Sequence, residues 1–190
     1  MDRKNVLLVF AMEEEAANAF QDYKCIFTGV GKVNATYALM KEIAVRRPQA
    51  IINLGTAGST TFNRGTVVCC THFIQRDMEV SALGFEKFQT PFESIPIVLD
   101  NGFEIENLPQ GTCGSGDQFE MEHTNSEYDV IEMEAYALAK VAVQENIPFI
   151  CLKYISDGAD GNAVQDWSLE IKKASIALRN VLDSVFIETS

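Results

Sequence analysis

Short apolar runs separated by segments of helical period dominate the chain. A run of about five apolar residues without polar alternation is typical of a strand that is buried on both faces of a parallel sheet. This pattern predicts strands at residues 5–10, 24–30, 50–54, 66–73 and 149–155, and helices at residues 13–22, 32–46, 134–146 and 168–187. Residues 80–110 contain Pro91, Pro96 and Pro109 and show no clear period, so we expect them to be irregular.

Strands that alternate with helices imply an α/β fold, here a three-layer sandwich with a mainly parallel or mixed central sheet. No linker or internal repeat divides the 190 residues, so we expect one domain over residues 1–190. Ligands of such sheets bind at the carboxyl ends of the strands. Four predicted strands end in polar or glycine-rich segments, namely Ala11-Met12-Glu13-Glu14-Glu15, Gly29-Val30-Gly31, Gly55-Thr56-Ala57-Gly58 and Ser156-Asp157-Gly158.

The segment Gly29-Val30-Gly31 lies between a predicted strand and a predicted helix, as a dinucleotide-binding loop would. That fingerprint requires a third Gly or Ala where Asn34 stands, and an acidic residue at the end of the next strand, which ends at Leu54. A phosphate-binding loop would require a glycine where Ile26 stands. The pattern therefore favours a tight strand-to-helix turn, whose bare backbone leaves room for a small ligand.

Acidic residues follow several of these strand ends. The carboxylates of residues 13–15 suit the first turn of a helix, where they face the positive end of the helix dipole. Glu132 and Glu134 open the next strong helix in the same way, and Asp157 and Asp160 suit a turn. Each carboxylate thus has a structural explanation. Three acidic strand ends in one domain also suit acid–base chemistry on a glycosidic bond.

Composition narrows the class of ligand. The formal charge of −12 opposes binding of nucleic-acid polymers, and no basic segment suggests a pocket for an anionic nucleotide. The first apolar run is too short for a signal peptide or a membrane span, so we expect a cytoplasmic protein that does not bind membranes. The five cysteines form no CxxC pair and are expected to be reduced and mostly buried. With two histidines at unsuitable spacing, we expect no metal.

Six short segments occur along the chain in an order that is known from one protein family. Each segment alone is a weak signal, and only the ordered set is specific. They are Ala11-Met12-Glu13-Glu14-Glu15, Gly29-Val30-Gly31-Lys32-Val33-Asn34-Ala35, Asn53-Leu54-Gly55-Thr56-Ala57-Gly58, Ser115-Gly116-Asp117-Gln118-Phe119, Glu132-Met133-Glu134-Ala135 and Ile155-Ser156-Asp157-Gly158-Ala159-Asp160. Through them the chain resembles the 5′-methylthioadenosine/S-adenosylhomocysteine nucleosidases of the purine nucleoside phosphorylase superfamily. The resemblance implies a nucleoside phosphorylase-like fold and an N-glycosyl hydrolase that needs no cofactor and acts in methionine salvage.

The resemblance also implies three catalytic carboxyl groups. Asp157 matches the general acid that protonates purine N7, so that the base leaves neutral. Glu15 matches the general base that activates water for attack on the anomeric carbon. Glu134 matches the residue that hydrogen-bonds the ribose hydroxyls. A carboxylate near the sugar would stabilise the positive charge of an oxocarbenium-like transition state.

Substrate-binding residues follow from the same resemblance. Met133 would pack beneath the sugar, and Phe119 would stack on the base. The backbone of Glu120 would read the edge of the base, and Trp167 would close over the 5′ substituent. The other residues implied in the pocket are Met12, Val30, Thr56, Ala57, Gly58 and Ser156.

Phosphorolysis is the rival reaction in this superfamily. The related phosphorylases hold phosphate with arginines near the loop of the first strand and before the third glycine turn. This chain has three acids at the former position and Asn53 at the latter, which favours a hydrolase. Two alternatives stay open: another purine nucleosidase or phosphorylase of the superfamily, such as a futalosine hydrolase, and a nucleoside-binding domain without turnover.

The chain departs from the family in several places. A single strand replaces an expected hairpin before Gly29, and residues 94–110 replace an expected helix. Lys153 stands where the family usually has arginine, and Glu120 replaces an apolar residue, so that its charge would favour an amino-bearing base. The resemblance further implies a homodimer in which three residues reach the other protomer's pocket, Leu83, Phe85 and Pro91.

Overall fold

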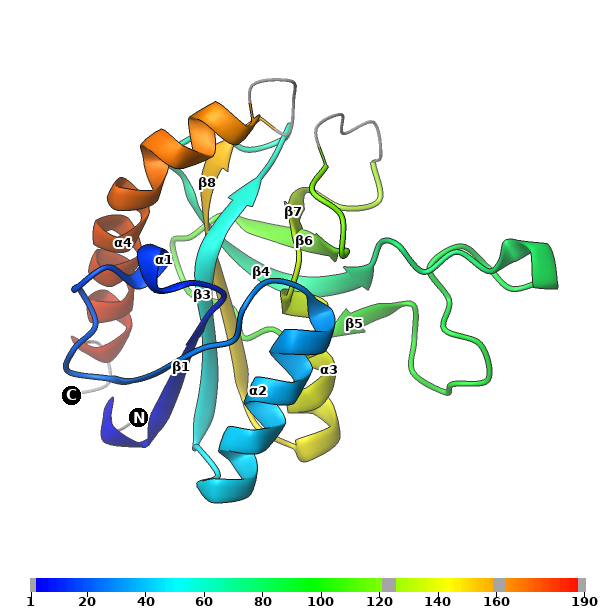
Figure 1. Ribbon diagram of the computed structural model, residues 1–190, viewed down its shortest axis with the longest axis horizontal. Helices are drawn as coiled ribbons and strands as arrows, with labels where there is room; N and C mark the ends of the chain where they lie inside the picture. The colour runs from blue at the N-terminus through cyan, green and yellow to red at the C-terminus, as the bar shows by residue number, and fades with distance from the viewer. Residues whose placement is uncertain (1–2, 121–125, 159–162, 188–190) are drawn as a thin grey trace.

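The computed structural model describes residues 3–120, 126–158 and 163–187, and shows a central sheet with helices on both faces (Figure 1). The strands are β1 (Val6–Phe10), β2 (Lys24–Phe27), β3 (Ala50–Gly58), β4 (Val67–Gln75), β5 (Val98–Asp100), β6 (Gln110–Ser115), β7 (Val130–Glu132) and β8 (Phe149–Asp157). The helices are α1 (Glu13–Ala16), α2 (Lys32–Val45), α3 (Ala135–Glu145) and α4 (Ala163–Ile187), with short 3₁₀ segments η1 (Arg3–Asn5) and η2 (Ser81–Leu83). All the strands belong to one eight-stranded sheet.

The sheet consists of two parallel groups. Strands β2, β1, β3 and β8 are parallel neighbours, and β7, β6 and β4 form the second group. Antiparallel pairing joins the groups twice, at β3 with β7 through Gly58 and Ile131, and at β8 with β4. The path β3-β7-β6-β4-β8 therefore returns to β3 and closes into a ring, while β5 lies antiparallel on β4. The predicted mixed, mainly parallel sheet is confirmed.

Helices cover both faces of this sheet, α1 and α4 on one side and α2 and α3 on the other (Figure 1). The side chains of β1 alternate between the two layers. Leu7 and Val9 pack in the cluster with α2 and α3, whereas Val6, Leu8 and Phe10 pack in the cluster with α1 and α4. Successive residues of a strand point to opposite faces, so a strand covered on both faces must be apolar throughout. This confirms the three-layer sandwich.

Several predicted boundaries are wrong. The helix predicted over residues 13–22 ends at Ala16, because Ala17 has a φ of 45° and leaves the helical region. The third strand does not end at Leu54. It continues to Gly58, because its last residues pair with β8 and β7. The strand predicted to end at residue 30 is β2, which ends at Phe27, and the helix predicted to begin at residue 168 is α4, which begins at Ala163.

The two expected shortenings are confirmed. Between α1 and Gly29 the chain forms the single strand β2, and residues 94–110, all of them described, contain β5 and no helix. Residues 78–97, which we call the arm, extend away from the body between β4 and β5 (Figure 1). Among the described helices, none has both the length and the apolar character that a bilayer span requires.

Candidate active site

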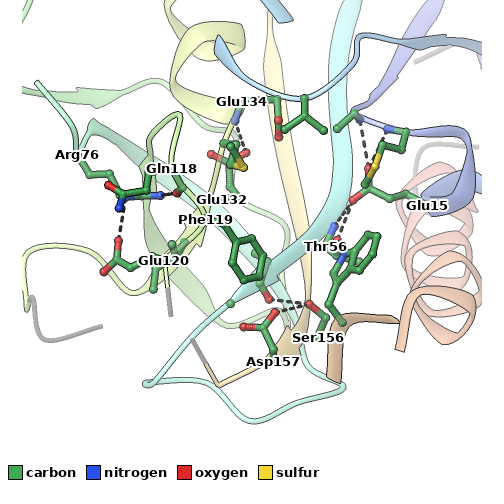
Figure 2. A pocket seen from close by; sticks show the side chains of 18 residues that line it. Glu15, Thr56, Arg76, Gln118, Phe119, Glu120, Glu132, Glu134, Ser156 and Asp157 are labelled. Atoms are coloured by element: carbon green, nitrogen blue, oxygen red, sulfur yellow. Dashed lines mark hydrogen bonds and ion pairs between the residues drawn. The ribbon is translucent and has the colours of Figure 1, made fainter. Parts of the chain in front are cut away.

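A cavity of about 340 Å³ opens where the carboxyl ends of both parallel groups meet. Its size is within the range of small-molecule sites. Every residue that the sequence placed in the chain's own pocket lines it: Met12, Glu15, Val30, Thr56, Ala57, Gly58, Phe119, Glu120, Met133, Glu134, Ser156, Asp157 and Trp167. Figure 2 shows the carboxyl groups of Glu15, Glu134 and Asp157 at three separate places around this cavity.

Glu15 is held in the cavity by hydrogen bonds from both sides of its carboxylate. One oxygen accepts from the Thr56 backbone N–H and hydroxyl, both at 2.8 Å, and the other accepts from the backbone N–H groups of Ala11 and Met12 at 3.2 and 3.3 Å. Gly55 permits this approach, since a Cβ there would stand 3.0 Å from the same carboxylate. Glu15 is buried, at 3% exposure, whereas its two acidic neighbours in α1 are exposed.

Trp167, from α4, fixes the direction of the Thr56 hydroxyl. The indole N–H donates to Thr56 Oγ1 at 2.9 Å. An indole nitrogen can only donate, so Thr56 must accept there and has its own proton available for Glu15. Trp167 therefore contributes a polar contact to this wall of the cavity as well as an aromatic surface.

Asp157 is placed by the last residues of β8. It is 4% exposed, and the hydroxyl of Ser156 donates to its Oδ2 at 2.8 Å. Gly58 is its register partner on β3, and Ser59 N–H donates to the Asp157 backbone carbonyl. Phe119 stands nearby in the cavity and is 47% exposed (Figure 2). The end of β8 thus presents a buried carboxyl group beside an open aromatic face.

Glu134 belongs to a buried network of charges. Its Oε1 accepts from the Gly31 backbone N–H at 2.7 Å, which ties the β2–α2 turn to the start of α3. The neighbouring Glu132 forms an ion pair with Lys153 at 3.1 Å and accepts from the Ser115 hydroxyl and from two backbone N–H groups at the start of α3. Burial opposes ionisation of Glu132, but Lys153 and these donors outweigh it and lower its pKa.

The same surroundings act oppositely on Glu134. Burial is the larger cause and the negative charge of Glu132 the second, and together they raise the pKa of Glu134 to about 8. Lys153 also favours ionisation of Glu134, but more weakly, because its ion pair is with Glu132. Near neutral pH, Glu132 is therefore mainly ionised and Glu134 mainly protonated.

This difference predicts a pH dependence of stability. The pKa of Glu134 is raised from its usual 4.5 to about 8, so between these values the folded state binds more protons than the unfolded state, and stability falls as pH rises. Glu134→Gln removes the titrating group and can still accept from Gly31. We expect the melting temperature of the variant, relative to native protein, to be higher at pH 8.5 than at pH 5.5 by scanning calorimetry. The exposed control Glu86→Gln should show no such difference, and an equal shift at both pH values for Glu134→Gln would contradict the assignment.

Five lining residues were missed by the sequence prediction: Ala11, Arg76, Gln118, Ile131 and Glu132. Ala11, Gln118 and Glu132 lie inside the motifs already quoted, so their neighbours were a usable signal. Arg76 follows β4 and carries no local signal. It is a cation that the sequence did not place at the cavity, and it is ion-paired with Glu120 at 2.9 Å. The carboxylate of Glu120 therefore faces a cation. The positive charge of Arg76 offsets the attraction that we expected between Glu120 and an amino-bearing base.

The three residues expected to reach a partner lie on the arm and not in the cavity of their own chain. Leu83 is 74% exposed, and Phe85 packs against Phe92 with ring centroids 5.3 Å apart. The five cysteines are all free, and all but Cys25 are buried. In the part of the chain that the structure describes, no three His, Cys, Asp or Glu side chains group as a metal site.

The chain is similar to known proteins along most of its length. The model of the phosphorylase superfamily matches residues 21–187. A 5′-methylthioadenosine/S-adenosylhomocysteine nucleosidase of Haemophilus influenzae (strain PittEE) is 31% identical over 182 residues, which cover 85% of this chain and 80% of that protein. Among solved structures, the Helicobacter pylori 5′-methylthioadenosine/S-adenosylhomocysteine nucleosidase superposes with a TM-score of 0.88 at 20% identity, covering 99% of this chain and all of the other. The futalosine hydrolase of the same organism gives a TM-score of 0.87 at 19% identity, covering 97% and 99% of the two chains.

Proposed function

The chain belongs to the 5′-methylthioadenosine/S-adenosylhomocysteine nucleosidase family of the phosphorylase superfamily, and on this premise we propose that it hydrolyses the N-ribosidic bond of a purine nucleoside. The substrates proposed are 5′-methylthioadenosine and S-adenosylhomocysteine, with release of adenine. The observation that carries the proposal is the placement of three buried carboxyl groups, Glu15, Glu134 and Asp157, around one nucleoside-sized cavity. A role in methionine salvage in the cytoplasm is part of the same proposal.

The reaction needs a proton donor and a proton acceptor on opposite parts of the substrate. Asp157 donates a proton to N7 of the base, and the C1′–N9 bond breaks with its electron pair moving to the base. Water attacks C1′ and passes a proton to Glu15, whose carboxylate is oriented by four donors. Glu134 hydrogen-bonds the ribose hydroxyls, while Phe119 stacks on the base. The products are adenine and the free sugar.

Water is favoured over phosphate as the nucleophile. Among the described residues that line the cavity, Arg76 is the single cation, and its guanidinium is engaged with Glu120. Asn53, at the position where related phosphorylases have arginine, is buried and donates to the Val9 carbonyl. A phosphate dianion would therefore meet carboxylates without a free cationic partner.

The proposal predicts adenine release that is independent of phosphate. Purified protein should release adenine from 5′-methylthioadenosine. The rate should be unchanged by a chelator or by about 50 mM phosphate, which is an excess over a typical KM of at most about 1 mM. Liquid chromatography of the free base measures the rate, and a purine nucleoside phosphorylase is the control. Formation of a ribose 1-phosphate that requires phosphate would contradict hydrolysis. A panel that includes futalosine separates the two kinds of nucleosidase, and binding without any base release would support a non-catalytic nucleoside-binding domain.

We also propose that the protein is a homodimer whose arms meet the other protomer near its pocket. Large apolar side chains are exposed on the arm and on α2, among them Phe92 at 96%, Leu83 at 74%, Val33 at 78% and Tyr37 at 69%. Such a surface is more typical of an interface than of a free protein face. Light scattering at about micromolar concentration should report twice the chain mass, a test chosen because tight interfaces persist there. A strictly monomeric, fully active enzyme would contradict the dimer and leave the chemistry intact.

A further inference from the structure

Arg76 contacts both residues that flank Phe119. Its guanidinium donates to the backbone carbonyl of Gln118, and it forms an ion pair at 2.9 Å with the carboxylate of Glu120 (Figure 2). The side chain of Arg76 is 6% exposed and that of Glu120 is 18% exposed, so water screens this pair little. One buried cation thus holds the chain immediately before and immediately after the open aromatic ring.

The backbone of Arg76 is itself anchored on the sheet. The backbone N–H of Arg76 donates to the Ser115 carbonyl at 2.9 Å, and Ser115 is buried at the end of β6, where its hydroxyl accepts from Tyr136 N–H at 2.7 Å. Gly116 leaves the space for the arginine, because a Cβ at that position would stand 2.9 Å from Arg76 Cζ. The contacts therefore connect a rigid strand end to the segment that carries Phe119.

Phe119 needs such support more than most pocket residues. The residue is 47% exposed, so protein packing covers only about half of it before a ligand binds. Ordering a flexible backbone costs conformational entropy, and a base that has to order its own stacking partner binds more weakly. A segment that is already held in place avoids this cost.

We propose that Arg76 is a positioning residue for the leaving base: it orders residues 118–120, so that Phe119 and the backbone of Glu120 are in place when a purine arrives. The ion pair also offsets the charge of Glu120, which leaves a site suited to a neutral purine. The inference rests on the proposed function for the identity of the base. It concerns binding, so it is tested with free adenine as well as with the nucleoside.

The experiment compares Arg76→Met with Gly116→Ala, which keeps both charges but displaces the guanidinium. Adenine binding is measured by calorimetry and by fluorescence, since the chain's one tryptophan, Trp167, lines the cavity. We expect Arg76→Met to raise the adenine Kd and the KM for 5′-methylthioadenosine about 10- to 100-fold with kcat within about threefold, the pattern of lost uniform binding. Gly116→Ala should raise both about 3- to 10-fold. The matched control Arg47→Met, at an exposed pair with Glu145, should bind adenine like native protein.

A double variant separates the two contributions of the arginine. Arg76→Met with Glu120→Gln removes the ion pair without leaving a buried unpaired charge. Adenine binding that stays weak in the double variant supports the positioning role. Recovery to the native Kd would overturn it and show that Arg76 acts only by compensating the charge of Glu120. If Arg76→Met does not fold, Gly116→Ala decides the question.

Other outcomes bear on the two proposals separately. A folded Arg76→Met protein with native adenine Kd and native KM would overturn the positioning role, and so would a loss confined to kcat. Native protein that binds adenine but cleaves no nucleoside would overturn the proposed hydrolysis. In that case a raised adenine Kd in Arg76→Met would still support the inference about Arg76.

Discussion

Glu15→Gln is expected to abolish adenine release while nucleoside binding stays measurable. The native carboxylate accepts four hydrogen bonds, two on each oxygen. An amide of the same shape keeps one acceptor oxygen, which should face the shorter contacts from Thr56, but it cannot take the proton of the attacking water. Loss of a general base costs about two to four orders of magnitude in rate. Base release and the binding of a non-hydrolysable analogue measure the two effects separately.

The matched controls are Glu13→Gln and Glu14→Gln. Both residues belong to α1 and are exposed, and neither lines the cavity. Each should retain native turnover and lose about 0.3 kcal/mol of stability through the helix dipole. An active Glu15→Gln beside an inactive Glu13→Gln or Glu14→Gln would show that the motif is aligned in the wrong register. Activity in all three variants would place the general base elsewhere.

Asp157→Asn is expected to lower turnover by about two to four orders of magnitude, the usual contribution of a general acid. The variant keeps the side-chain volume, and its oxygen can still accept from the Ser156 hydroxyl. The amide can donate a hydrogen bond to N7 but cannot transfer a proton to it, so the base would have to leave as an anion. Substrate affinity should change little, and single-turnover kinetics would place the loss in the chemical step.

The control for this variant is Asp100→Asn, an exposed carboxylate on β5 that pairs with His72 outside the cavity. It should retain native kcat and KM. Turnover of adenine nucleosides by Asp157→Asn at a near-native rate would mean that Asp157 serves only the turn after β8. The family mechanism would then not apply to this chain.

Local pattern determined the layers of the fold, and the resemblance to a known family predicted most of the cavity. The apolar run of β1 required cover on both faces, and the structure provides it with α1 and α4 on one face and α2 and α3 on the other. The resemblance predicted thirteen of the lining residues, and several of these lie at the carboxyl ends of parallel strands, which meet at one edge of the sheet. In the triple acid, the third residue was selected by resemblance, and the structure buries that one and exposes the other two.

Tertiary structure alone decided the closure of the sheet. The short strands β6 and β7 have no continuous apolar run, because glycine and polar residues occupy β6 and β7 has three residues. Their pairing depends on partners far along the chain, as with Gly58 and Ile131, and a local pattern does not encode such a partner. The same holds for the end of β3, which sequence reasoning placed at Leu54.

The electrostatics of the site were also decided in three dimensions. Lys153 and Glu132 come from β8 and β7, and Arg76 reaches Glu120 from the end of β4, so no spacing along the chain links either pair. Which charge is compensated depends on burial and on distances of about 3 Å, at which Coulomb energies change steeply with position. The sequence therefore identified Glu15, Glu134 and Asp157 as acids of the cavity, and only the fold added Glu132 and determined which acid there has a cation beside it.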